Sequence, residues 1–152
     1  MQIPHITRSL VLLILLVTPV SAVMAFEEIN LPYFGRVALG GYDPVSYFTQ
    51  SEAVEGNKSY SAEWKGATWL FSSEANRLRF MENPEAFAPQ YGGYCSNQMS
   101  LGNLSDIDID VWRIIDNKLY LFGHDSGRNR WASETDLRIL DADRHWESYL
   151  KR

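Results

Sequence analysis

The stretch YSAEWKGATWLFSSEANRLRFMENP, residues 60–84, carries the local signals that indicate the fold class. Residues 60–64 and 67–71 are rich in aromatic and strand-forming residues, and Lys65-Gly66 lies between them. Two such runs joined by a two-residue loop with a glycine predict a β-hairpin.

A helix is expected directly after this hairpin. Ser72 or Ser73 is suited to cap it, and Asn83-Pro84 predicts its end, because proline is poorly tolerated inside a helix. The apolar positions expected to face the core repeat every three residues, at Ala75, Leu78 and Met81.

The second half of the chain repeats these kinds of signal. Residues 111–115 and 118–122 flank Asp116-Asn117, two residues that tolerate positive φ, and predict a second hairpin. Residues 133–136 (SETD) resemble a capping box and predict a terminal helix. The apolar positions expected along that helix are Leu137, Leu140, Trp146 and Leu150.

The chain is therefore predicted to form a small α+β domain with two β-hairpins and two to three helices. Residues 31–49 predict a short strand, a turn and a short helical or extended piece before the first hairpin. We find no internal repeat, no low-complexity tract and no linker long enough to divide the domain.

The N-terminus has the layout of a secretory signal. Residues 1–25 contain a polar start, the apolar run at 10–17 (LVLLILLV) and then small residues. Cleavage is expected after Ala25, with Ala22 as the alternative site and an uncleaved anchor as the alternative role. Residues 26–152 are then a single domain in the periplasm or secreted, with no membrane contact after cleavage.

The composition argues against nucleic acid as a partner and against an internal disulfide as a source of stability. The formal net charge of −5 disfavours nucleic acid, because an acidic domain is repelled by phosphate backbones. One cysteine cannot form an internal disulfide, so the fold depends on packing. Five Trp, eight Tyr and seven Phe supply the large apolar side chains that such packing needs.

Cys95 has a functional and a structural interpretation. A catalytic thiol needs a base such as His124 or His145, yet no known nucleophile motif surrounds Cys95. The two histidines also lack the short spacing of a zinc site on one helix. Gly92-Gly93 supplies a tight turn beside it, and free cysteine is among the most buried residue types, so an inert, packed Cys95 is the structural alternative.

Asp106, Asp108 and Asp110 alternate with apolar residues. Acids at positions 1, 3 and 5 begin a calcium loop, but Val111 and Asn117 stand where that loop needs glycine and glutamate. The alternation instead predicts a β-strand with one solvent-exposed face.

Four motifs in order connect this chain with a known family. They are GGYDPVSYF (40–48), the stretch from SAEWKGATWLF to QYGGYCS (61–96), DNKLYLF (116–122) and Arg130-Trp131. In this order and spacing the chain resembles the YHS domain family, in its exported bacterial branch, from about Leu39 to Trp146. The resemblance implies a YHS-like fold for most of the chain.

The resemblance does not carry over the metal site of the cysteine-bearing relatives. In that branch, cysteines stand at the positions held here by Ser46, Ser72 and Asn76. Soft cations are held by thiolates, so the loss of all three removes that ligand set.

A substitute site is the hypothesis we derive from what remains. Asp43 and Cys95 offer a carboxylate and a thiolate, and Met99 lies one helical turn after Cys95 as a thioether. A Cys and a Met at this spacing suit copper or another soft metal ion. Met99 in the core is the structural alternative.

The function predicted from the sequence is that of an exported, non-enzymatic domain that binds a small ligand, a metal ion or a partner protein where the two glycine turns meet. Asp43 would anchor a cation or polar group, Tyr94 would wall the pocket and Cys95 would be the soft donor. The alternatives are a protein interaction module with a structural Cys95, and a thiol-dependent redox protein.

Overall fold

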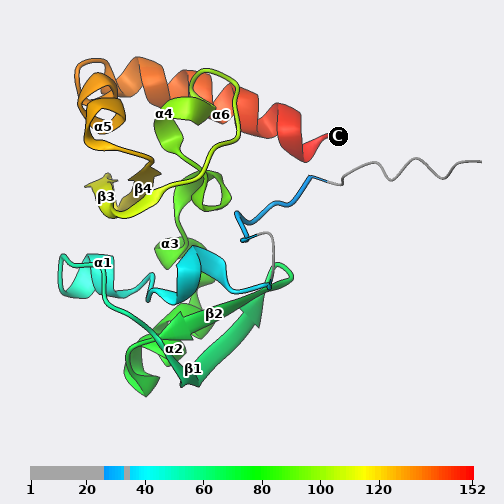
Figure 1. The fold of residues 1–152 in the computed structure, drawn as a ribbon, viewed down its shortest axis with the longest axis vertical. Coiled ribbons are helices and arrows are strands. Elements are labelled where there is room, and N and C mark those ends of the chain that lie inside the picture. The colour runs from blue at the N-terminus through cyan, green and yellow to red at the C-terminus, as the bar shows by residue number, and fades with distance from the viewer. Residues whose placement is uncertain (1–25, 33–34) are drawn as a thin grey trace, which may run out of the picture.

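The computed structural model describes residues 26–32 and 35–152, so the expected signal peptide, residues 1–25, lies outside the described residues. The elements are η1 (Ala38–Gly41), α1 (Ser46–Thr49), β1 (Asn57–Trp64), β2 (Ala67–Phe71), α2 (Glu74–Glu82), α3 (Pro84–Phe87), η2 (Gln90–Gly93), α4 (Ser96–Met99), β3 (Asp108–Ile115), β4 (Lys118–Phe122), α5 (Asp125–Ala132) and α6 (Thr135–Leu150). The strands form two antiparallel two-stranded sheets, β1-β2 and β3-β4. The predicted α+β class is confirmed (Figure 1).

Both predicted hairpins are confirmed. Lys65-Gly66 and Asp116-Asn117 adopt positive φ at both positions of the loop, which suits the right-handed twist of the flanking strands. β1 begins at Asn57, three residues before the predicted run.

The first long helix, α2, starts and ends as predicted but buries another face. The Ser73 hydroxyl caps it by accepting a hydrogen bond from the Asn76 N–H at 3.2 Å. Leu78 and Met81, however, are 54% and 52% exposed, whereas Asn76 and Phe80 are buried. The expected apolar face is wrong because the Phe80 ring, 5.2 Å from that of Trp69, sets which side packs on the hairpin.

The terminal helix is also confirmed, but its predicted capping box is wrong. Glu134 is the N-cap of α6 and makes no side-chain cap. Ser133 ends α5 instead, and its hydroxyl donates to the Arg130 carbonyl at 2.8 Å.

The predicted apolar face of α6 is only partly correct. Leu137, Leu140 and Leu150 are exposed, while Ala142 is buried and Ile139, Trp146 and Tyr149 are partly buried against the core. The leucines therefore lie on the side of α6 that faces solvent.

The expectation that the chain has no internal repeat is wrong. Unit 1, residues 38–82, and unit 2, residues 90–132, each contain a glycine turn, a short helix, a hairpin and a helix in the same order. Three successive residues of each turn have positive φ: Leu39, Gly40 and Gly41 in η1, and Tyr91, Gly92 and Gly93 in η2. Figure 1 shows unit 1 below and unit 2 above, with α6 lying over unit 2.

The strand register repeats with the same spacing. Asn57 pairs with Phe71 at one end of the first hairpin, and Asp108 pairs with Phe122 at the corresponding end of the second, each residue standing 51 positions later. A register shift follows Asn57 and Asp108 in turn. The two hairpins therefore have the same length, turn and bulge, although their sequences differ.

A backbone hydrogen bond after each turn also repeats. The Asp43 N–H donates to the Val54 carbonyl at 2.8 Å, and the Cys95 N–H donates to the Ser105 carbonyl at 2.9 Å. Asp43 and Cys95 therefore occupy corresponding places in the two units.

The apolar core consists of two clusters: the first contains unit 1 residues together with Leu119 and Leu121 of β4, and the second lies within unit 2 and α6. Large aromatic residues centre each apolar cluster: Trp69, Phe71 and Phe80 in unit 1, and Tyr91, Phe122 and Trp131 in unit 2. Ile107 packs against both clusters. The Tyr47 hydroxyl donates to the Ile109 carbonyl at 3.0 Å and so joins unit 1 to β3.

Residues 26–32 cross the second glycine turn. The Asn30 N–H donates to the Gly92 carbonyl at 2.8 Å. A Cβ at Gly92 would stand 1.8 Å from the Glu28 carbonyl oxygen, so only glycine fits beneath this segment.

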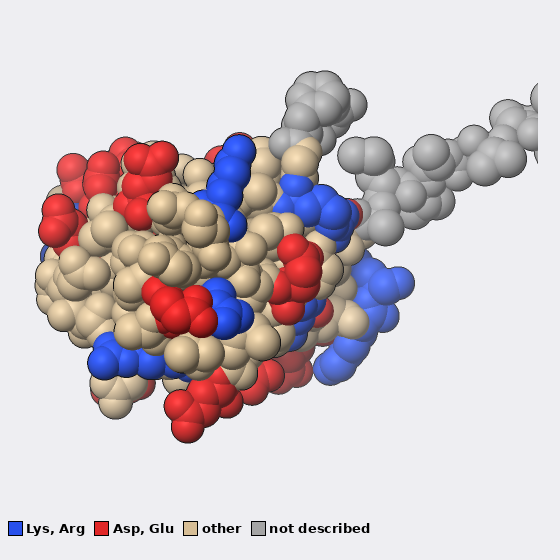
Figure 2. Space-filling view, turned by 90° about the horizontal axis from the view of Figure 1, so that it is seen from below, with Lys and Arg blue, Asp and Glu red and all other residues tan. Residues whose placement is uncertain are grey.

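The surface carries charges of both signs. Figure 2 shows acidic and basic side chains interspersed with uncharged residues on the face seen from the unit 1 end, where no continuous basic stripe is visible. None of the described helices has the length and apolar character that a membrane crossing requires.

Candidate functional site

Asp43 is fully buried and has hydrogen-bond partners on both carboxylate oxygens. Oδ1 accepts from the Val45 N–H at 2.8 Å. Oδ2 accepts from the Ser72 N–H at 2.8 Å, the Ser72 hydroxyl at 2.7 Å and the Asn76 side-chain amide at 2.7 Å. With four donors around it, this carboxylate joins the first glycine turn to the start of α2.

The three positions that hold cysteine in the metal-binding branch of the resembled family also meet here. Ser72 and Asn76 donate to Asp43, as described above. The Ser46 hydroxyl lies within hydrogen-bond distance of the Asp43 carbonyl, at 2.7 Å, and of the Glu52 carbonyl, at 2.8 Å. The arrangement is a closed hydrogen-bond network of oxygen and nitrogen atoms.

Cys95 has the same structural role in unit 2. Its side chain is buried, with 3% of the residue exposed, and Sγ accepts from the Gly123 N–H at 3.3 Å. Gly123 and Ser72 each directly follow the second strand of their hairpin. The thiol therefore joins the second glycine turn to the start of α5, as the Asp43 carboxylate does in unit 1.

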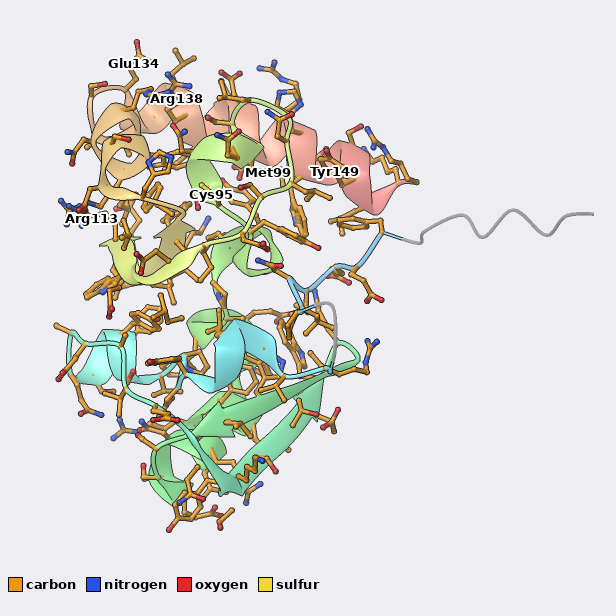
Figure 3. All side chains as sticks on the ribbon, viewed as in Figure 1. Cys95, Met99, Arg113, Glu134, Arg138 and Tyr149 are labelled. Atoms are coloured by element: carbon orange, nitrogen blue, oxygen red, sulfur yellow. The ribbon has the colours of Figure 1, made fainter. Side chains whose placement is uncertain are left out.

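The structure does not bring the predicted soft-metal ligands together. Asp43 belongs to the hydrogen-bond network of unit 1, whereas Cys95 and Met99 are buried in the apolar cluster of unit 2. Figure 3 shows Cys95 and Met99 on the α4 segment beneath α6. Among the described residues, no group of three or more His, Cys, Asp or Glu is arranged to hold a metal ion.

Tyr94 does not wall a pocket with Cys95 either. Its ring lies 6.4 Å from that of Trp146, and its hydroxyl donates to the Glu27 carbonyl at 3.1 Å. Burial raises the pKa of Tyr94, and the Glu27 and Asp106 carboxylates add to the shift. Its polar end holds the segment formed by residues 26–32.

The histidines have local partners. His124 caps α5, since its Nδ1 accepts from the Gly127 N–H at 3.0 Å. A Cβ added at Gly102 would lie 3.2 Å from the His145 ring, so this imidazole packs on the loop after α4.

A groove does lie where the two glycine turns meet, as the sequence predicts. We name it the glycine-turn groove; its volume is about 520 Å³. It is lined by Asn30, Pro32, Leu39, Gly40, Tyr42, Gly93, Asp106, Ile107, Asp108 and Ile109. Both turns therefore contribute to it, but the predicted site residues Asp43, Tyr94 and Cys95 do not.

The chemistry of the glycine-turn groove is apolar with an acidic edge. Ile107, Ile109 and Leu39 supply branched aliphatic side chains, and the exposed Asp106 and Asp108 alternate with the two isoleucines. No lysine or arginine is among its described lining residues. The sequence pattern does not identify these residues as a site, because alternation predicts a strand with one solvent-exposed face and does not show what that face contacts.

A second cavity, of about 310 Å³, lies between the hairpin tips and the second turn. Trp64, Trp146, Lys65, Lys118 and Glu28 are among its lining residues, and Lys65 forms an ion pair with Glu28. It is smaller than the glycine-turn groove, and its charges of both signs do not favour one class of ligand.

Comparisons of this chain with family models, curated proteins and solved structures find no match. The resemblance to the YHS domain family therefore stays a prediction from the motifs.

Proposed function

We propose that this chain is an exported, non-enzymatic YHS-like domain, and that its glycine-turn groove binds a small ligand with an apolar body and a cationic end. The observation that carries the proposal is the groove itself, built by both turns and lined by aliphatic side chains beside two carboxylates. Concave, mostly apolar sites with a few polar groups are the usual form of small-molecule sites.

The class of ligand follows from the charges around the groove. Asp106 and Asp108 are acceptors, and no basic residue among the described lining residues opposes a positive charge. An amine or guanidinium attached to an apolar group satisfies both features, because its charge meets the carboxylates while its body covers Ile107 and Ile109.

The non-enzymatic part of the proposal is supported by the position of the thiol. Cys95 is buried and already accepts a hydrogen bond from Gly123, so the group that the sequence offers as a nucleophile is engaged in the fold. Export is supported by the N-terminal sequence pattern alone.

Calorimetric titration with phenethylamine, an alkyl amine that carries a phenyl group and is protonated at neutral pH, tests the proposal. We expect saturable binding. Asp108→Asn should weaken the affinity by about two- to fivefold, which corresponds to the loss of one partly solvated charge pair. Asp110→Asn is the matched control, because Asp110 lies on the same strand but does not line the groove. Phenylacetate, with the opposite charge, is expected to bind more weakly.

Equal binding of phenethylamine and phenylacetate would contradict the charge argument. Failure of both compounds to bind the wild-type protein would contradict the assignment of this groove to small ligands of this kind.

A protein interaction module is the second candidate, favoured by one observation. Leu137 and Leu140 are neighbours on the outer face of α6 and are 54% and 59% exposed. The candidate remains second because nothing in the described residues identifies what would cover these leucines.

A further inference from the structure

Buried polar side-chain atoms without a hydrogen-bond partner lie in one part of the described chain. Five buried side-chain atoms there have no partner: Ser96 Oγ, Asn97 Oδ1, Arg128 Nε, Trp131 Nε1 and Arg138 Nε. All five belong to α4, α5 or α6, three helices that pack on one another, and we name this place the helical junction. Buried polar atoms in native proteins are nearly always paired, so such a group needs an explanation.

Unit 1 has the same fold without buried, unpaired polar atoms at the corresponding positions, so the fold itself does not require them. Arg77 on α2 corresponds to Arg128 on α5, because each lies four residues after its helix N-cap. Arg77 donates from Nε to Glu74 at 2.8 Å and from Nη2 at 2.6 Å. The shorter Asp125 reaches only Nη2 of Arg128, at 2.7 Å, so Nε of Arg128 remains buried and free.

Other positions of α2 and α5 also differ between the two units in whether their polar atoms have partners. Phe80, fully buried in α2, corresponds to Trp131 in α5, which adds an indole N–H with no partner. Asn76 donates to Asp43 in unit 1, whereas its counterpart is Gly127. The His124 ring and the Asn97 amide lie beside this glycine, 3.2 Å and 3.6 Å from the place a Cβ would take.

A second guanidinium reaches the helical junction from α6. Arg138 places Nη1 3.4 Å from the Ser100 hydroxyl and Nη2 3.2 Å from Glu134, and its Nε is unpaired. Figure 3 shows Glu134 at the outer end of α6 and Arg138 on the side nearer α4. The side chains of Arg128 and Arg138 are mostly buried, while their acidic partners Asp125 and Glu134 are largely exposed.

We propose that the helical junction is a binding site for a small oxyanion of the phosphate type. Three of the free atoms are N–H groups that only donate, two of them on guanidinium groups, and the Ser96 hydroxyl can donate as well, whereas the fifth, Asn97 Oδ1, is an acceptor. Charge-assisted hydrogen bonds from arginine to an oxyanion are among the strongest that proteins form.

The access that we propose for this site is at the connection between α5 and α6. A hollow of about 380 Å³ lies there and is lined by residues 132–137, which include the acidic residues Glu134 and Asp136. Movement of the exposed Glu134 carboxylate away from Arg138 would open the guanidinium toward this hollow. The site is separate from the glycine-turn groove, so it does not depend on the proposed function.

The test uses inorganic phosphate and the full domain. At constant ionic strength, with chloride as the reference anion, phosphate is expected to raise the unfolding temperature along a saturating curve. Arg138→Gln should weaken phosphate binding by at least about tenfold, which is the loss of one charge-assisted hydrogen bond. Arg144→Gln is the matched control on the same helix, because Arg144 also pairs with an acid one turn earlier but is 67% exposed.

A measurement on the unsubstituted protein avoids any dependence on whether a variant folds. Phosphate should shift the NMR signals of the Nε–H groups of Arg128 and Arg138 and of the Trp131 indole, and leave the Nε–H of Arg77 unchanged. Equal shifts at Arg77, or no saturable binding, would overturn the proposal. Equal affinities of the Arg138→Gln and Arg144→Gln variants would show an adventitious ion only and would also overturn it.

Discussion

Asp43 and Cys95 fill the same place in the two units with different chemistry. Each follows a glycine turn, and each accepts the N–H of the residue that follows its hairpin. The carboxylate accepts three more hydrogen bonds, whereas the sulfur lies in an apolar cluster. The single cysteine is thus explained by a structural role.

This role predicts how Cys95 responds to substitution and to reagents. Cys95→Ala leaves the Gly123 N–H without its acceptor and opens a small cavity, so we expect the free energy of unfolding to fall by about 1–3 kcal/mol. Cys95→Ser keeps an acceptor and should lose less. Denaturant titration measures both values.

Labelling checks the same claim in the unaltered protein. A thiol-blocking reagent, followed by mass spectrometry, should modify Cys95 only after unfolding. Rapid blocking of the native protein would contradict the structural role and favour the thiol-dependent alternative.

The sequence could locate the turns and the candidate site residues, but not the residues that they contact in the fold. The two glycine turns were predicted to meet at a surface, and they do. The predicted site residues Asp43, Tyr94 and Cys95 do not line that groove, because the place of a side chain depends on the packing of segments far apart in the sequence. Asp43 receives donors from residues 29 and 33 positions away, which no local pattern reveals.

At the scale of elements, the two glycine turns provide a matched experiment. Gly40 and Gly92 have nearly the same φ, 60° and 62°, but a Cβ at Gly40 would meet open space, whereas one at Gly92 would meet the Glu28 carbonyl. Gly40→Ala should reduce the free energy of unfolding by about 1–2 kcal/mol through left-handed strain alone.

Gly92→Ala should cost more and should also release residues 26–32 from the second turn. Hydrogen exchange at the Asn30 N–H, which donates to Gly92, reports that release. Similar stability losses in the two variants, with Asn30 still protected, would show that the segment does not lie across this turn.

The sequence predicted which helices and hairpins form more readily than it predicted which face of each helix is buried. Hairpins are specified by their loops, and Lys65-Gly66 and Asp116-Asn117 adopt positive φ values, which Gly66, Asp116 and Asn117 tolerate. The faces of α2 and α6 depend on tertiary contacts, which is why Phe80 and Ala142 are buried while Leu78 and Leu140 are not.

At the scale of the whole molecule, buried tyrosines predict the alkaline limit of stability. Burial raises the pKa of Tyr47, Tyr91 and Tyr94, and it raises the pKa of Tyr120 to about 12, with Asp143 and Asp116 adding to the shift. An unfolded tyrosine titrates near pH 10. Above that pH the unfolded chain loses its phenolic protons first, so the free energy of unfolding falls as the pH rises from about 10 toward 12.

Denaturant titrations at a series of pH values, followed together with tyrosinate absorbance, measure this effect. Tyr120→Phe should reduce the slope of stability against pH. A native protein whose tyrosines all ionise near pH 10, with no loss of stability, would contradict the burial of these rings.

The duplicated architecture is not visible in the sequence, for a physical reason. Backbone geometry repeats from unit 1 to unit 2, but the side chains that serve it change, as with Asp43 and Cys95 or Ser73 and His124. Few identities therefore remain beyond the glycine turns and the strand ends.

The central claim, that the glycine-turn groove is the ligand surface, is tested most directly by methyl NMR of Leu39, Ile107 and Ile109 during titration with phenethylamine. We predict saturable shifts of the methyl groups of these three residues, with that of Met99, buried in unit 2, unchanged. Shifts that appear elsewhere, while the methyl signals of Leu39, Ile107 and Ile109 stay in place, would contradict the claim.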